Sequence, residues 1–126
     1  MKKNLNVLIA DTESIVITDL KDKLHGWGYR VSTPESNDAF TSEWIKKNNP
    51  DAVIIDDDFP FMEAGIKKAM EISQQHNIGV ILVCAWMNEK IKRISSELKS
   101  FQCLSKPFTN EELQRSLERI LTKQNN

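Results

Sequence analysis

The chain has 126 residues, of which 40% are hydrophobic and 28% are charged, and its net charge is -1. This length and composition are typical of one globular domain that buries a core without disulfide or metal crosslinks. The balanced charge gives no electrostatic basis for binding nucleic acid or an anionic membrane, and no apolar run is long enough to span a bilayer. The two cysteines, Cys84 and Cys103, lie far apart in apolar segments, so we expect a reduced, cytoplasmic protein.

Five short apolar runs predict five β-strands. They cover residues 6–10, 29–33, 52–56, 79–85 and 101–105. Three of these runs are almost continuously aliphatic, as in "AVIID" and "GVILVCA". Strands of a parallel sheet that is covered on both faces have this composition, whereas a strand with one solvated face alternates apolar and polar residues.

Apolar residues at helical spacing lie between and after these runs. They are Val16, Leu20, Leu24 and Trp27, with Gly28 as a stop; Phe40 and Trp44, before a turn at 48–50; Ile66, Ala69, Met70 and Ser73; Ile91, Ile94 and Leu98; and Leu113, Leu117, Ile120 and Leu121. Either Thr109 or Asn110 suits the N-cap of the last helix. We expect frayed termini at 1–4 and 123–126.

Five alternating strands and helices predict a single α/β domain over residues 1–126, with an open parallel sheet and helices on both faces. In such folds ligands bind at the carboxyl ends of the strands. Acidic residues follow the first and third runs, and a lysine follows the fifth. They are Asp11, Asp56, Asp57, Asp58 and Lys106. Clustered carboxylates suit a hard cation such as Mg²⁺, and a nearby lysine can pair with a carboxylate or a phosphoryl oxygen.

The segments "VLIADTE", "PDAVIIDDDFP" and "LSKPF", in this order and spacing, resemble the receiver domain of bacterial response regulators. The resemblance covers nearly the whole chain. It implies a flavodoxin-like, doubly wound sheet of five strands in the order 2-1-3-4-5, flanked by five helices. It also implies a two-component phosphorelay protein that takes a phosphoryl group from a histidine kinase onto Asp56, with no enzymatic activity beyond its own phosphorylation.

The resemblance assigns roles to individual residues. Asp11 corresponds to the first acid of a metal-binding pair, and Asp58 stands where a backbone carbonyl binds Mg²⁺ beside Asp56. Lys106 corresponds to the lysine that contacts the phosphoryl group, and Pro107 follows it through an expected cis peptide bond.

Four positions depart from the family pattern. The second acid of the metal pair is Thr12, which makes its role as a ligand doubtful and predicts weak Mg²⁺ binding. The Thr/Ser position that bonds the phosphoryl group is Cys84, and an aromatic position is Cys103. The glycine that follows the third-strand motif is displaced to Gly65.

Some residues also have simpler interpretations. We expect Asp57 to be a solvated charge, and Thr12 to form a turn or to cap the helix after it. Cys84 and Cys103 suit small buried hydrophobic positions, although neighbouring fourth and fifth strands would bring them near each other. Trp86 either shields the site or packs on the surface.

Two functions remain open. In the first, phosphorylation of Asp56 shifts the face built by the fourth helix, fifth strand and fifth helix, which then signals to an output domain or a partner protein. In the second, the chain is a degenerate receiver that binds partners without phosphorylation. A homodimer stays open in both. A flavodoxin-like cofactor binder is disfavoured because "DTESI" is acidic where a phosphate-binding loop is needed.

Overall fold

The computed structural model describes residues 4–124 and contains one parallel β-sheet. Its strands are β1 (Asn6–Ala10), β2 (Arg30–Ser32), β3 (Ala52–Asp56), β4 (Gly79–Cys84) and β5 (Phe101–Ser105). They lie in the order β2-β1-β3-β4-β5, with every neighbouring pair parallel. The expected doubly wound, flavodoxin-like sheet with five flanking helices is therefore confirmed.

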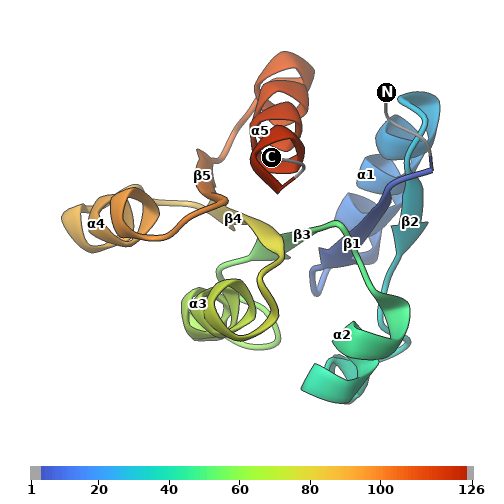
Figure 1. The fold of residues 1–126 in the computed structure, drawn as a ribbon, viewed down its shortest axis with the longest axis horizontal. Coiled ribbons are helices and arrows are strands. Elements are labelled where there is room, and N and C mark those ends of the chain that lie inside the picture. The colour runs from blue at the N-terminus through green and yellow to red at the C-terminus, as the bar shows by residue number, and fades with distance from the viewer. Residues whose placement is uncertain (1–3, 125–126) are drawn as a thin grey trace.

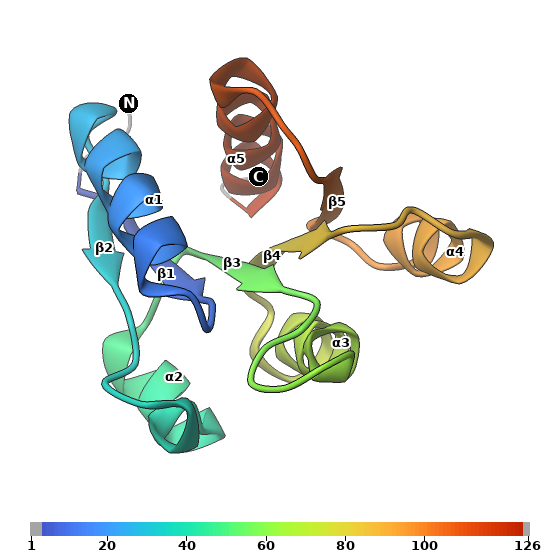
Figure 2. The same cartoon turned by 180° about the vertical axis from the view of Figure 1, so that it is seen from behind.

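Helices cover both faces of this sheet (Figures 1 and 2). The α-helices are α1 (Ser14–Gly26), α2 (Ser42–Asn48), α3 (Ala64–His76), α4 (Glu89–Glu97) and α5 (Asn110–Gln124), and a short 3-10 helix, η1 (Asn37–Ala39), precedes α2. On one face α1 and α5 bury Leu24 and Leu117, and on the other face α2, α3 and α4 bury residues such as Ile72 and Ile91. No helix in the described part of the chain is long and apolar enough to cross a membrane.

The burial of the central strands on both faces explains why their sequences do not alternate apolar and polar residues. Every residue of β1, β3 and β4 is buried, because helices pack on both faces. Side chains of even and odd positions therefore enter different cores: Val53 and Ile55 face α2 to α4, whereas Ile54 faces α1 and α5.

The start of α5 is a capping box, which fixes where the chain turns after β5. The Thr109 hydroxyl accepts a hydrogen bond from the Glu112 backbone N–H at 3.1 Å, and the Glu112 carboxylate accepts one from the Thr109 N–H at 2.9 Å. Thr109 is therefore the N-cap, one of the two expected residues. The Lys106–Pro107 peptide bond, which lies just before this cap, is cis as expected, and so is Phe59–Pro60.

Several expected boundaries were wrong by a few residues. Phe40 does not lie in α2; it precedes the helix and its buried ring contacts Phe59 edge-on, with ring centroids 5.1 Å apart. Trp27 and Leu98 lie one residue beyond the ends of α1 and α4, in both cases as the C-cap. A single aromatic or aliphatic residue packs equally well on a core from a helix or from the loop beside it, so spacing alone does not separate the two.

Two strands are shorter than expected. β2 spans three residues rather than 29–33, and β4 ends at Cys84 rather than at residue 85. α5 continues to Gln124, and the expected fraying at 1–4 and 123–126 stays a prediction. Residues 1–3 and 125–126 lie outside the described residues.

Gly65, near the start of α3, lies against the backbone at the end of β3. A Cβ atom there would stand 2.0 Å from the Asp56 carbonyl oxygen and 2.6 Å from the Asp57 Cα. Its N–H donates a 2.8 Å hydrogen bond to the Asp57 carbonyl oxygen. The absence of a side chain at Gly65 therefore lets α3 approach the strand end that carries the three aspartates.

We predict that Gly65→Ala lowers the free energy of unfolding by roughly 2 kcal/mol or more, because the methyl group overlaps backbone atoms that cannot move away independently. Gly26→Ala is the matched control, since a Cβ at Gly26 meets nothing within 4 Å. Urea denaturation of both variants measures the difference. Equal stability of the two variants would contradict the close approach of α3 to β3.

Candidate functional site

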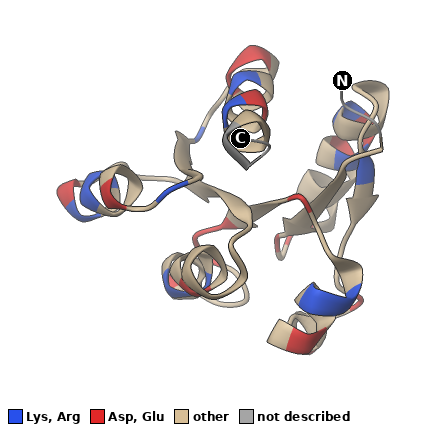
Figure 3. Cartoon of the chain, viewed as in Figure 1, with Lys and Arg blue, Asp and Glu red and all other residues tan. Residues whose placement is uncertain are grey.

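The carboxyl edge of the sheet gathers the charged residues that follow β1, β3 and β5. Parallel strands place their carboxyl ends on the same side, and acidic segments follow β1 and β3 (Figure 3). The strand register pairs Asp56 with Val83 and Cys84 with Ser105, so the ends of β3, β4 and β5 lie level. The sheet thus brings Asp11, Asp56 and Lys106 to one site.

The centre of this site is an ion pair between Asp56 and Lys106. Asp56 is only 6% exposed, and its Oδ1 lies 2.5 Å from the Lys106 Nζ. The other carboxylate oxygen, Oδ2, accepts a 2.9 Å hydrogen bond from the Asp58 N–H. Burial alone would lower the pKa of Lys106, but the contact with Asp56 outweighs it and raises that pKa above its ordinary value. Lys106 therefore carries a positive charge at neutral pH.

Asp11 adds a second carboxylate beside this pair. Its Oδ1 accepts a 2.9 Å hydrogen bond from the Glu13 N–H, which shapes the turn between β1 and α1. Burial and the nearby Asp56 charge raise the pKa of Asp11, although the hydrogen bond from Glu13 and the Lys106 charge oppose this. The site consequently holds one carboxylate for which the surroundings oppose ionisation.

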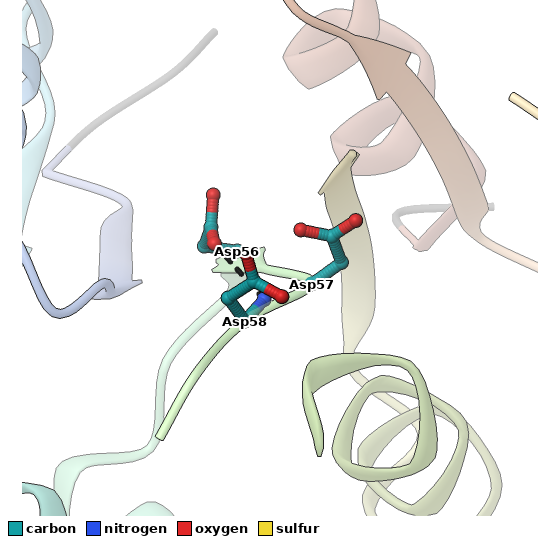
Figure 4. Close-up of side chains that lie close together, drawn as sticks. All are labelled: Asp56, Asp57 and Asp58. Atoms are coloured by element: carbon teal, nitrogen blue, oxygen red, sulfur yellow. Dashed lines mark hydrogen bonds between the residues drawn. The ribbon is translucent and has the colours of Figure 1, made fainter. Parts of the chain in front are cut away.

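Asp57 and Asp58 extend the acidic cluster toward β4 and α3 (Figure 4). Carboxylate oxygens of Asp56, Asp57 and Asp58 lie within 4.8 Å of one another. The Asp58 side chain is exposed and accepts a 3.0 Å hydrogen bond from the Glu63 N–H. Glu63 adopts a left-handed backbone conformation, with φ at 63°, and this geometry turns the loop back toward Asp58.

The expectation of a solvated Asp57 holds only in part, because its side chain is half-buried. One of its carboxylate oxygens, Oδ1, is buried and has no hydrogen-bond partner among the described residues. Burial first, and then the charges of Asp56 and Asp58, raise the pKa of Asp57. The sequence did carry a signal for this position, since Asp57 directly follows a strand that is buried along its whole length.

Thr12 is exposed and does not cap α1. The N-cap of that helix is Glu13, which makes no side-chain capping hydrogen bond. The expected capping role of Thr12 was therefore wrong, and the turn at this point depends on Asp11 instead. The β1–α1 loop presents a neutral residue where a second acid would add negative charge.

Cys84 and Cys103 are free and lie on the same face of neighbouring strands. The Cys84 side chain is fully buried, with Sγ 3.9 Å from the Leu104 carbonyl oxygen. The Cys103 Sγ lies 3.8 Å from the Ile91 carbonyl oxygen, between β5 and α4. Burial raises the thiol pKa of both residues, that of Cys103 to about 11, so both are uncharged. Cys84 fills the expected role of a small buried hydrophobic residue, and Cys103 is half-buried against the same core.

A groove of about 550 Å³ opens above the ion pair, between α1 and the β5–α5 loop. Asp11, Asp56 and Lys106 form its charged part, and Ile15, Val16 and Phe108 are among its apolar lining residues. Ile15 is 83% exposed. Trp86, after β4, is 81% exposed and thus does not pack on the domain surface.

Comparisons with known proteins agree on one family. The family model described as "Response regulator receiver domain" matches residues 7–118. The transcriptional regulatory protein PdtaR of Mycobacterium tuberculosis is 26% identical over 112 residues, which cover 89% of this chain and 54% of that protein. The chain thus spans about half the length of the curated relatives it matches.

Solved structures show the same fold. A response regulator receiver domain protein from Clostridium thermocellum superposes with a TM-score of 0.79 at 21% identity, covering 96% of this chain and 97% of the other. The chemotaxis protein CheY4 of Vibrio cholerae gives a TM-score of 0.76 at 22% identity, covering 93% and 98%. With the family model matching most of its length, the chain belongs to the response regulator receiver domains of two-component systems.

Proposed function

We propose that this domain accepts a phosphoryl group from the phosphohistidine of a histidine kinase or phosphotransfer protein, and that Asp56 is the acceptor. The observation that carries this proposal is the buried Asp56 carboxylate at the end of β3, in contact with Lys106 Nζ. A carboxylate in that position is a nucleophile with a cation already beside it. We further propose a cytoplasmic location and no direct binding to nucleic acid or membrane by this domain.

The transfer forms one bond and breaks another. A carboxylate oxygen of Asp56 attacks the phosphorus atom, and the phosphorus–nitrogen bond breaks with its electron pair passing to the imidazole nitrogen. The product is an acyl phosphate on Asp56. Lys106, which is positively charged and 39% exposed, offers its ammonium group to the phosphoryl oxygens as they arrive.

The acidic residues fit a Mg²⁺ ion, because hard cations prefer oxygen ligands. The carboxylates lie close together at this site, and the positive charge nearby does not balance them. Asp11, Asp56 and the backbone carbonyl of Asp58 are the residues that would hold it. Bound Mg²⁺ would supply positive charge against the phosphoryl oxygens. Thr12 contributes no charge, so we expect weak affinity.

The groove between α1 and the β5–α5 loop fits the approach of the phosphodonor. Ile15 and Phe108 are among its apolar lining residues, and Asp11, Asp56 and Lys106 also line it. The apolar residues would supply contact area for a partner protein beside the charged groups.

Signalling would pass through α4, β5 and α5. Lys106 directly follows β5, and its N–H donates a 2.9 Å hydrogen bond to the Cys84 carbonyl oxygen, so movement of Lys106 acts on β4 and β5 together. Cys103 lies between β5 and α4, at the position where the family pattern has an aromatic residue, and its side chain is smaller than an aromatic ring. We propose an output domain or partner protein, or a second copy of the chain, as the recipient of this signal.

The second candidate is a degenerate receiver that binds a partner through the same face without phosphorylation. The observations that favour it are the neutral, exposed Thr12 and the buried Cys84, which weaken metal binding and phosphoryl recognition respectively. Labelling with a small phosphodonor separates the two candidates.

We predict that acetyl phosphate with Mg²⁺ labels the chain at Asp56, and that Asp56→Asn abolishes the label because an amide is not a nucleophile of this kind. Mass spectrometry of the borohydride-reduced product locates the modified residue. Modification of Asp57 or Asp58 would place the acceptor elsewhere, and no labelling at all would favour the degenerate receiver.

We predict that Asp11→Asn raises the free energy of unfolding at pH 7 without Mg²⁺. The amide keeps an oxygen acceptor for the Glu13 N–H but removes a charge that burial and Asp56 disfavour. The pKa of Asp11 is raised in the folded protein, so its ionisation costs stability above that pKa. The gain in the variant should therefore shrink as the pH falls toward 4.

Urea denaturation at pH 7 and pH 4 measures this effect, and Asp22→Asn on the exposed side of α1 controls for net charge. Saturating Mg²⁺ should reverse the order at pH 7, because the ion stabilises the wild type more. A variant that is less stable than the wild type at pH 7 without Mg²⁺ would contradict the role of Asp11.

We predict that phosphorylation of the wild type changes chemical shifts in α4 and α5 only slightly, and that Cys84→Thr enlarges these changes. A thiol is a weak donor, whereas a hydroxyl can donate a charge-assisted hydrogen bond of roughly 1.5–3 kcal/mol to a phosphoryl oxygen. That energy is comparable with the gap between two receiver conformations. A complete switch in the wild type would instead indicate another donor, with Ser105 the first candidate.

A further inference from the structure

The groove above the ion pair is lined mostly by apolar residues. α1 packs on β1 and β2, whereas α5 packs on β3, β4 and β5, on the same face of the sheet (Figures 1 and 2). Ile9, Ile54 and Val83 of the central strands line the groove between α1 and the β5–α5 loop. The α1 residues that line it run from Ile15 to Lys23, so the groove leads from the ion pair along about two turns of that helix.

The charges in this groove favour an anion at one place. Lys106 contacts Asp56 but its side chain remains 39% exposed, so its ammonium group can meet an incoming phosphoryl group. Lys23, farther along α1, already pairs with Asp19 at 2.8 Å. Two acids of the β1–α1 turn also line the groove and would repel a second anionic group. The groove therefore suits a ligand with one phosphoryl group and an uncharged remainder.

Ile15 is a large apolar residue of the groove that the domain itself leaves uncovered. It is 83% exposed, whereas Val16 and Phe108 are partly buried against the core under α1 and α5. A groove of about 550 Å³ with a mainly apolar lining and an accessible cationic group has the size and composition of a small-molecule site. An aliphatic chain that covers Ile15 would remove apolar surface of both partners from water, which favours binding.

We propose that this groove binds the acyl chain of a small acyl phosphate, so that the domain accepts phosphoryl groups from short-chain aliphatic acyl phosphates in preference to acetyl phosphate. This inference rests on the proposed phosphoacceptor function of Asp56 and names a class of donor for it. Ile15 is a specificity-determining residue in this scheme, because it contacts the chain and takes no part in the transfer.

The transfer from an acyl phosphate balances without a proton. A carboxylate oxygen of Asp56 attacks the phosphorus atom, and the bond from phosphorus to the acyl oxygen breaks with its electron pair passing to that oxygen. The products are the acyl phosphate of Asp56 and a free carboxylate, and the total charge is unchanged. Added methylene groups lie away from the reacting carboxyl group and do not alter it as a leaving group. A dependence of the rate on chain length therefore reports on contacts with the chain.

The test measures initial labelling rates of the wild type with acetyl, propionyl and butyryl phosphate, each at the same low concentration and at saturating Mg²⁺. Butyryl phosphate carries two more methylene groups than acetyl phosphate. Their partial burial should raise the rate roughly three- to tenfold, with propionyl phosphate between the two. Phosphoramidate, which has no acyl chain, serves as the reference donor, and mass spectrometry follows the label on Asp56.

Two variants locate the contact. Ile15→Gln removes the exposed apolar group but keeps a residue that forms helices well, so the butyryl-to-acetyl ratio should fall to within about twofold of unity. Its rate with phosphoramidate should equal that of the wild type, which also shows that the variant is folded. Met62→Gln is the matched control: Met62 is 78% exposed in the β3–α3 loop and lies outside the groove, so the ratio should stay at the wild-type value.

The outcomes separate this inference from the function on which it rests. Equal rates with acetyl and butyryl phosphate in the wild type overturn the inference and leave the phosphoacceptor function intact, with the groove serving only a partner protein. A preference for butyryl phosphate that persists in Ile15→Gln also overturns the inference, because the chain then binds elsewhere. No labelling by any donor overturns the phosphoacceptor function and the inference with it.

Discussion

The buried ion pair between Asp56 and Lys106 is the interaction on which the rest of the site depends. A carboxylate that is 6% exposed loses several kcal/mol of hydration, which a cation at 2.5 Å and the Asp58 N–H offset. Lys106 can reach Asp56 only because β5 lies beside β4 and ends level with it. The ion pair therefore fixes the ends of β3, β4 and β5 relative to one another, and one of its members, Asp56, is the proposed phosphoryl acceptor.

Negative charge at this edge exceeds what one lysine balances. Asp11 and Asp57 both have raised pKa values, for which burial is the largest cause, so their ionisation costs folding free energy at neutral pH. A protein selected for stability alone would not hold both carboxylates there. Their presence would be explained if the folded state binds a cation at this edge, as the proposed function requires.

The apolar runs were sufficient to predict a parallel sheet with helices on both faces, because near-continuous aliphatic runs are typical of strands covered on both sides. The order of the strands came from the resemblance to receiver domains, and with that order the strand ends converge by geometry. The Asp56–Lys106 contact follows from that convergence. The environment of Asp57 does not follow from that convergence. The surroundings of its side chain depend on how far the chain continues along β4 after β3 ends. Phe40 was misplaced for a related reason: a buried ring looks the same in sequence whether its backbone is helical or not.

The three substitutions at Thr12, Cys84 and Cys103 affect different steps, which bears on the choice between the two functions. In the proposed function, Thr12 would reduce the negative charge that holds a metal ion. Cys84 and Cys103, which contact carbonyl oxygens of β5 and α4, would weaken the path from the phosphoryl group to those elements. None of them replaces a member of the ion pair, although the Cys84 carbonyl oxygen accepts a hydrogen bond from the Lys106 N–H. A domain that had lost phosphorylation would gain nothing from a buried Asp56–Lys106 pair, since well-packed apolar replacements of such pairs are often neutral or stabilising. The retained pair therefore favours a receiver that still accepts phosphoryl groups. The altered residues favour a weak conformational response to phosphorylation.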